Sequence, residues 1–120
     1  MKKIKIKKPN NRKLLKEWSR IVRDRDGNCC AVCGSDKFIQ AHHLLAKKKY
    51  PQYKLDPKIG IALCSGHHCF FPRSAETNAI WFANWLRINR PEQYEYCFNL
   101  IFTKENKDDL WKEQANTQPS

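Results

Sequence analysis

Two cysteine-containing segments, CCAVCG at Cys29–Gly34 and LCSGHHC at Leu63–Cys69, enclose a histidine pair at His42–His43. All four histidines of the chain and five of its six cysteines fall between Cys29 and Cys69. Cysteines and histidines paired at this spacing are typical of zinc ligands. The stretch therefore predicts a small domain stapled by a metal ion, with a second group of histidines beside the metal.

A structural zinc ion needs four sulfur or nitrogen ligands in a tetrahedron. The residues that we expect to provide them are Cys30, Cys33, Cys64 and His67. Cys64 and His67 are three residues apart, which places them on one face of a helical turn. Cys29 is an alternative to Cys30, and Cys69 is an alternative to His67.

The three remaining histidines predict a catalytic group. His42 and His43 are neighbours at the end of a predicted strand, so their side chains diverge. His68 projects about a quarter-turn away from His67 on the helix. We expect His42 and His68 to bind one divalent ion while His43 stands free above it as a general base for water. Taken singly, each histidine is also compatible with a structural role.

Composition limits the class of protein. The 120 residues are 41% hydrophobic, which suits one domain with a modest core. No apolar run reaches the length of about 18 residues that a membrane span needs. The basic segment Met1–Lys8 is not followed by the apolar region of a signal peptide. We therefore expect a reducing, cytoplasmic environment, in which paired cysteines bind metal rather than form disulfides.

The net charge of +11 is concentrated near the N-terminus. Residues 1–25 carry 11 lysines and arginines against two acids, a net charge of +9, whereas residues 91–120 carry three lysines against six acids, a net of −3. This asymmetry favours DNA as a partner over an acidic membrane surface, although a solvated tail gives the same pattern. The residues that we expect to contact DNA are Lys13, Lys16, Arg20, Arg23, Lys47, Lys48 and Lys49.

Periodicity predicts an α+β domain between a flexible basic arm at 1–11 and a polar tail at 104–120. Asn10 or Asn11 is the expected N-cap of the first helix, and Ser74 or Thr77 that of the helix at 76–89. The expected elements are a helix at 12–25, a strand at 38–43, a loop at 44–58, a strand at 59–63, and helices at 64–71, at 76–89 and from Pro91 onward.

Three runs carry a family resemblance: RDGNCCAVCG at 25–34, AHH at 41–43 and DPKIGIALCSGHH at 56–68. Together they resemble the zinc-containing branch of the HNH endonuclease family over about residues 23–72, and looser similarity to phage-borne members continues through 81–94. The resemblance implies a domain at 12–103, with a ββα-metal core at about 29–71 and helices at 74–102. It also implies hydrolysis of DNA phosphodiesters.

By position, His43 matches the family's general base, His42 its first metal ligand and His68 its second. The implied catalytic ion is Mg²⁺, Mn²⁺, Ni²⁺ or Zn²⁺, which would polarise the scissile phosphate and stabilise the leaving 3′-oxygen. Ile59 replaces the asparagine of the family motif, which ties a loop to the backbone and helps to orient the base. Pro72 stands where some relatives carry a histidine. We therefore expect a looser loop, and a gain of activity from Ile59→Asn if the missing asparagine limits turnover.

These observations predict a metal-dependent DNA endonuclease of the phage or mobile-element type that nicks or cuts both strands. For a phage protein, the compartment would be the host cytoplasm. One alternative is a catalytically weak or inactive zinc-stapled DNA-binding module. The other is a zinc-structured protein-interaction domain whose basic arm serves solubility.

Overall fold

The computed structural model describes residues 10–102. The predicted tail at 104–120, and the predicted arm up to residue 9, lie outside the described residues. The elements in chain order are α1 (Asn11–Arg25), β1 (Ile39–His43), η1 (Pro51–Tyr53), η2 (Pro57–Ile59), β2 (Gly60–Cys64), η3 (Gly66–Phe70), α2 (Ala79–Asn89) and α3 (Pro91–Ile101). The predicted α+β class is confirmed for this part of the chain.

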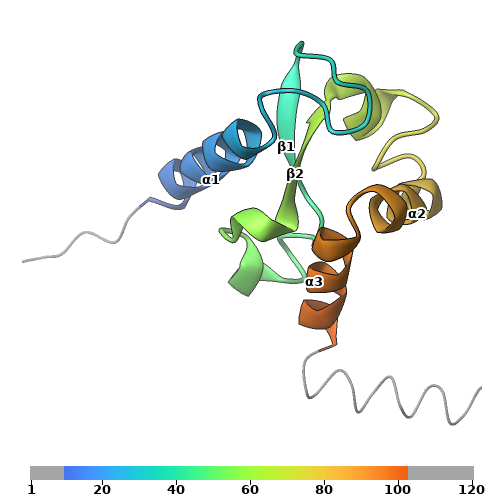
Figure 1. The fold of residues 1–120 in the computed structure, drawn as a ribbon. Helices are drawn as coiled ribbons and strands as arrows, with labels where there is room; N and C mark the ends of the chain where they lie inside the picture. The colour runs from blue at the N-terminus through green and yellow to red at the C-terminus, as the bar shows by residue number, and fades with distance from the viewer. Residues whose placement is uncertain (1–9, 103–120) are drawn as a thin grey trace, which may run out of the picture.

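The two strands form an antiparallel hairpin that separates the helices. α1 lies on one side of the hairpin and α2 on the other (Figure 1). His42 pairs with Ile61 in the register, and His43 pairs with Gly60. Because successive side chains of a strand point to opposite faces, His42 faces α2 and His43 faces α1.

Each face of the hairpin has its own hydrophobic core. On the α2 side, Ile61 and Leu63 pack against Phe82 and Leu86. The core on the α1 side consists of Trp18, Val22, Leu45, Ile59 and Cys97. Gly60 permits the close approach of α1, because a Cβ there would lie 2.6 Å from atoms of both Trp18 and Val22.

A buried carboxylate joins α1, β2 and the start of α3. The Asp26 side chain is 4% exposed and forms ion pairs with Arg25 at 3.0 Å and Arg90 at 3.1 Å. Its Oδ2 also accepts a hydrogen bond from the backbone N–H of Ala62 at 2.8 Å. Burial opposes ionisation of Asp26, but these donors and cations outweigh it and lower the pKa of the carboxyl.

Two helix starts agree with the sequence. α1 begins at Asn11, and the side chain of Asn10 accepts a hydrogen bond from the Arg12 N–H at 3.0 Å, as an N-cap does. α3 begins at Pro91, where the missing N–H costs nothing. Both strands lie within one residue of their predicted bounds.

Two helix predictions are wrong. The predicted helix at 64–71 shrinks to one wide turn, η3, because Cys64 ends β2 and pairs with Ile39. α2 starts at Ala79 rather than 76, capped by Asn78, which accepts from the Trp81 N–H at 3.0 Å. Of the predicted caps, Ser74 is fully buried in the preceding loop.

The loop at 44–58 is more ordered than expected, since it contains the short helix η1 and the start of η2. The Leu44 N–H donates to the Ile59 carbonyl at 2.8 Å, and the Ile59 side chain is fully buried. Backbone pairing and core packing therefore anchor the loop where the sequence predicted looseness.

Candidate metal centre and histidine site

Four of the predicted ligands meet in one cluster with the dimensions of a tetrahedral zinc site. Its members are Cys30, Cys33, Cys64 and His67, whose ligand atoms all lie within 4.8 Å of one another. The sulfurs of Cys33 and Cys64 are 3.8 Å apart, and Nδ1 of His67 lies 3.3 Å from the Cys64 sulfur and 3.8 Å from that of Cys30. Tetrahedral zinc with Zn–S of about 2.3 Å and Zn–N of about 2.05 Å requires S···S of about 3.8 Å and S···N of about 3.6 Å. The three distances lie close to these values, so the cluster could hold a structural metal ion.

The local backbone explains how the cluster forms. Gly34 adopts a φ of 76°, a conformation that favours glycine, and its N–H donates to the Cys30 carbonyl at 2.8 Å. The Ala31 N–H donates to the Ala62 carbonyl at 2.9 Å and fastens this turn to β2. Cys64 ends β2, so the turn η3 that follows carries His67 back toward the sulfurs.

The alternatives that the sequence left open lie outside the cluster. Neither Cys29 nor Cys69 contributes a ligand atom, and the Cys69 thiol instead donates to the Ser65 carbonyl at 3.7 Å. All six cysteines are free of disulfide bonds. The cluster of four possible ligands therefore contains Cys30 and His67, and not the alternatives Cys29 and Cys69.

The pKa shifts of Cys30 and His67 suit metal binding, whereas burial and the neighbouring thiols of Cys30 and Cys64 raise the pKa of Cys33. Burial raises the pKa of Cys30, but the backbone N–H groups of Cys64, Cys33 and Val32 outweigh it, so the pKa falls below its usual value. Burial lowers the pKa of His67 and favours its neutral, ligating form.

A second group of possible ligands lies beside the first. The rings of His42 and His68 meet edge to face with centroids 5.0 Å apart. Glu76 joins them, and the ligand atoms of all three residues lie within 4.8 Å of one another. Burial lowers the pKa of His42 to about 4, aided by the neighbouring His68 and His43, so this imidazole is neutral at pH 7 and has a lone pair to offer.

Sequence reasoning missed Glu76. It follows His68 by eight residues across a non-helical loop, and no spacing rule links the two positions. Only the three-dimensional path of residues 71–78 brings its carboxylate to the histidines. One acidic residue among several in the chain gave no signal by itself.

His43 lies on the opposite face of β1 from His42, and two neighbours hold its ring. Its ring stacks on Trp18 with centroids 3.7 Å apart and an interplanar angle of 14°. Nε2 lies 2.9 Å from the Lys54 carbonyl oxygen. Because a carbonyl only accepts, Nε2 carries the proton of the neutral ring, and the lone pair is on Nδ1. Burial lowers the pKa of His43, the Lys54 carbonyl opposes this, and the charge of Lys47 lowers it further.

The predicted DNA-contacting residues divide into two groups. Those on α1 share one face, and at about 100° per residue that face lies opposite Trp18, which packs on His43. Arg20 is also engaged within the helix by Glu17 and by Asp24, the latter at 2.8 Å. The loop residues, by contrast, are exposed and lie four to six positions after the end of β1; they are Lys47, Lys48 and Lys49.

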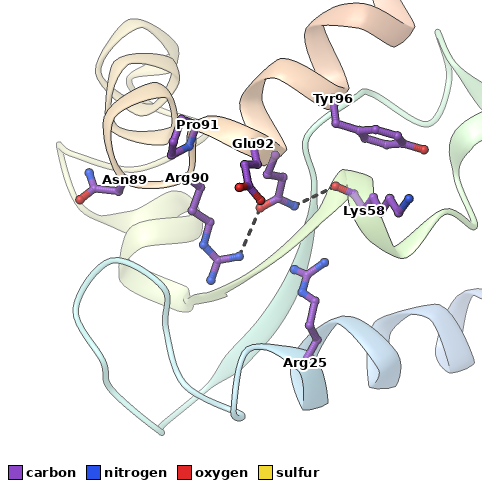
Figure 2. Close-up of a pocket in the computed structure, with 8 residues that line it drawn as sticks. Arg25, Lys58, Asn89, Arg90, Pro91, Glu92 and Tyr96 are labelled. Carbon is purple, nitrogen blue, oxygen red and sulfur yellow. Dashed lines mark hydrogen bonds between the residues drawn. The ribbon is translucent and has the colours of Figure 1, made fainter.

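A pocket of about 630 Å³ lies away from the histidines, at the junction of α2 and α3 (Figure 2). Arg25, Lys58 and Arg90 line it, but its arginines are engaged within the protein. Arg90 pairs with Asp26 at 3.1 Å and donates to Gln93 at 3.2 Å, and Gln93 donates to the Lys58 carbonyl at 2.9 Å. The charges of Arg25 and Arg90 therefore serve to hold α3 against the end of α1.

Among residues 10–102, no helix has the length and apolar character needed to cross a membrane. Comparisons with protein-family models, with curated proteins and with solved structures find no match for this chain. The resemblance to HNH endonucleases therefore rests on the sequence runs at 25–34, 41–43 and 56–68.

Proposed function

We propose that this chain is a zinc-stapled, metal-dependent endonuclease of the HNH type that hydrolyses DNA phosphodiester bonds. One observation carries the proposal: two donor groups lie side by side, one closed and one open. Three sulfurs and one nitrogen could supply all four ligands of a zinc ion, whereas His42 and His68 alone would leave positions for water and a phosphate oxygen.

The closed group takes a structural zinc ion in this proposal. Three thiolates and an imidazole are a ligand set that zinc prefers, and the 3.8 Å between the sulfurs of Cys33 and Cys64 suits a shared zinc ion. The zinc would fix the turn at Cys30–Gly34 to the end of β2. By binding His67, the zinc would also hold the neighbouring His68 in place, because the two residues are adjacent in the turn η3.

The open group takes a divalent ion, which when bound would polarise the scissile phosphate and stabilise the leaving oxygen. His43 is the general base. The Lys54 carbonyl holds its Nε2–H, so the unprotonated Nδ1 can accept a proton from the attacking water. His42 and His43 emerge on opposite faces at the end of β1, so the reacting phosphate would lie across that strand end.

DNA is the proposed substrate because the charge of +11 favours a polyanion. Lys47, Lys48 and Lys49 follow His43 in the chain and are exposed, which suits contacts to phosphates that flank the cut. The basic face of α1 points elsewhere and would contact DNA outside the cleavage site.

Nicking of supercoiled plasmid with added Mn²⁺ or Mg²⁺ tests the proposal. We expect His43→Ala and His43→Gln to reduce the cleavage rate by at least about 100-fold, the contribution of a general base, while keeping one bound zinc per chain. Gln is the matched variant, since its amide can still donate to the Lys54 carbonyl but cannot take a proton from water. Nicking at the wild-type rate by both variants would show that His43 is not the base.

Ile59 specifically favours a second candidate, a zinc-stapled DNA-binding module that does not cleave. The family's asparagine position is filled here by a fully buried apolar side chain. For such a module, DNA affinity would fall steeply with salt while no metal ion supports nicking.

A further inference from the structure

The two ring nitrogens of His68 have very different surroundings. Nε2 lies 3.3 Å from Oε1 of Glu76. Nδ1 is buried and has no hydrogen-bond partner, the one such side-chain atom among the described residues. Buried polar atoms are nearly always paired, so this nitrogen, in a ring that meets His42 edge to face, points to a partner from outside the chain, such as an ion or a water.

The backbone imposes the position of Glu76. After η3 the chain turns back, and the N–H groups of Ala75 and Glu76 donate to the carbonyls of His67 and His68 at 2.8 and 3.1 Å. The buried Ser74 fixes this return, since its hydroxyl accepts from the Thr77 N–H at 3.2 Å. Glu76 therefore lies beside His68 because of the fold of residues 67–77.

The proximity of Glu76 favours one tautomer of His68. An ionised carboxylate can only accept a hydrogen bond, so a carboxylate oxygen 3.3 Å from Nε2 favours the proton on that nitrogen. The neutral ring then has its lone pair on Nδ1, the buried atom that lacks a partner. Histidines that bind metals commonly donate their other ring N–H to a carboxylate in this way.

We propose that Glu76 is a positioning residue for the divalent ion of the open site. Glu76 holds Nε2–H of His68, and Nδ1 of His68 binds the ion together with His42. The inference rests on the proposed function, which supplies the ion, but the tautomer of His68 is a property of the chain without that ion. Glu76 itself is near enough to be a direct ligand, and the experiment separates these two roles.

The first measurement is long-range ¹H–¹⁵N NMR of the histidine rings, in protein carrying only the structural zinc. We expect the wild type and Glu76→Gln to show His68 protonated at Nε2, because the glutamine carbonyl also accepts. Glu76→Ala should show a mixture of the two tautomers. The matched control is Glu95→Ala, which removes the same charge from an exposed position of α3 and should leave His68 unchanged.

The second measurement is Mn²⁺ binding to the same proteins by calorimetry. We expect Glu76→Ala to weaken binding about 10- to 100-fold, the usual effect of losing such a partner, and Glu76→Gln to stay within a few-fold of the wild type. Equal loss in both variants would show that Glu76 is a ligand and overturn the positioning role. An unchanged His68 tautomer in Glu76→Ala would overturn it too.

The proposed function can fail separately. Absence of Mn²⁺ binding to the wild type would refute the open-site ion and the role of Glu76 toward it. The NMR experiment, by contrast, tests only the effect of Glu76 on the tautomer of His68. Binding and tautomer selection without nicking would leave the Glu76 inference intact and refute the nuclease.

Discussion

Restoring the family's asparagine by Ile59→Asn should destabilise the protein rather than improve it. The Ile59 side chain is fully buried among Trp18, Val22 and Leu45. Its backbone is already paired, because its carbonyl accepts from Leu44 and its N–H donates to the Asp56 carbonyl at 3.2 Å. The side-chain amide of an asparagine here would be shielded from water, and the backbone groups of residue 59 would already be paired.

The size of the effect follows from the burial of Ile59. Removing most of a buried isoleucine from a core costs about 2–5 kcal/mol, and an unpaired buried amide adds about 1–3 kcal/mol. Asparagine refills part of the volume, so we expect a total of about 3–5 kcal/mol. That is a large fraction of the stability of about 5–15 kcal/mol that a typical domain has.

Urea unfolding at a fixed excess of zinc measures this loss. Ile59→Val is the matched control, since it keeps the side chain apolar and should cost only about 0.5–1.5 kcal/mol. Plasmid nicking at low temperature, where both variants remain folded, compares their activity. We expect Ile59→Asn to cleave no faster than the wild type.

The reasoning fails if Ile59→Asn is as stable as Ile59→Val. It would mean that position 59 is not a core position, and that the asparagine finds partners which the structure does not provide. Faster cleavage by Ile59→Asn at wild-type stability would revive the sequence-based expectation that the missing asparagine limits turnover.

Three further predictions concern the metal centre, the base and the packing. Cys33→Ser should release the structural zinc and unfold the domain, because metal binding and folding are coupled; zinc content and circular dichroism measure this, and a folded, zinc-loaded variant would contradict it. The pKa of His43 is lowered from 6.5, so the ring is already an unprotonated base at pH 7. The cleavage rate should therefore stay constant from pH 8 to 7 and fall only below pH 6.5. A rate that still rises above pH 7 would argue against His43 as the base. Gly60→Ala should lower the melting temperature, as its Cβ would lie 2.6 Å from Trp18 and Val22, and an unchanged value would show that α1 can shift.

A fifth prediction follows from the buried, neutral His42. Its pKa is about 4 in the folded protein against 6.5 as the ordinary value, so the unfolded chain binds the extra proton. The neutral His42 therefore makes its full contribution to the free energy of unfolding above about pH 6.5. This contribution is lost as the pH falls toward 4, by up to about 3 kcal/mol. Urea unfolding without a second ion should show a shallower acid loss in His42→Gln, and parallel profiles for the two proteins would refute the shift.

Local sequence chemistry determined much of this protein. The start of α1 after Asn10, the start of α3 at Pro91 and the divergence of His42 and His43 follow from capping, ring geometry and strand alternation. These features depend on residues that are near each other in the chain, so spacing alone predicts them. The set of four metal ligands was also predicted, with rivals for two of its members.

Tertiary structure decided what depends on contacts between distant segments. The cluster of possible metal ligands contains Cys30 and His67 and not Cys29 and Cys69, because the hairpin and η3 determine which side chains meet. His43 received its tautomer from the Lys54 carbonyl, eleven residues away. Glu76 reached His68 only through the return of the loop at 71–78, since the partners of a side chain depend on the path of the whole chain.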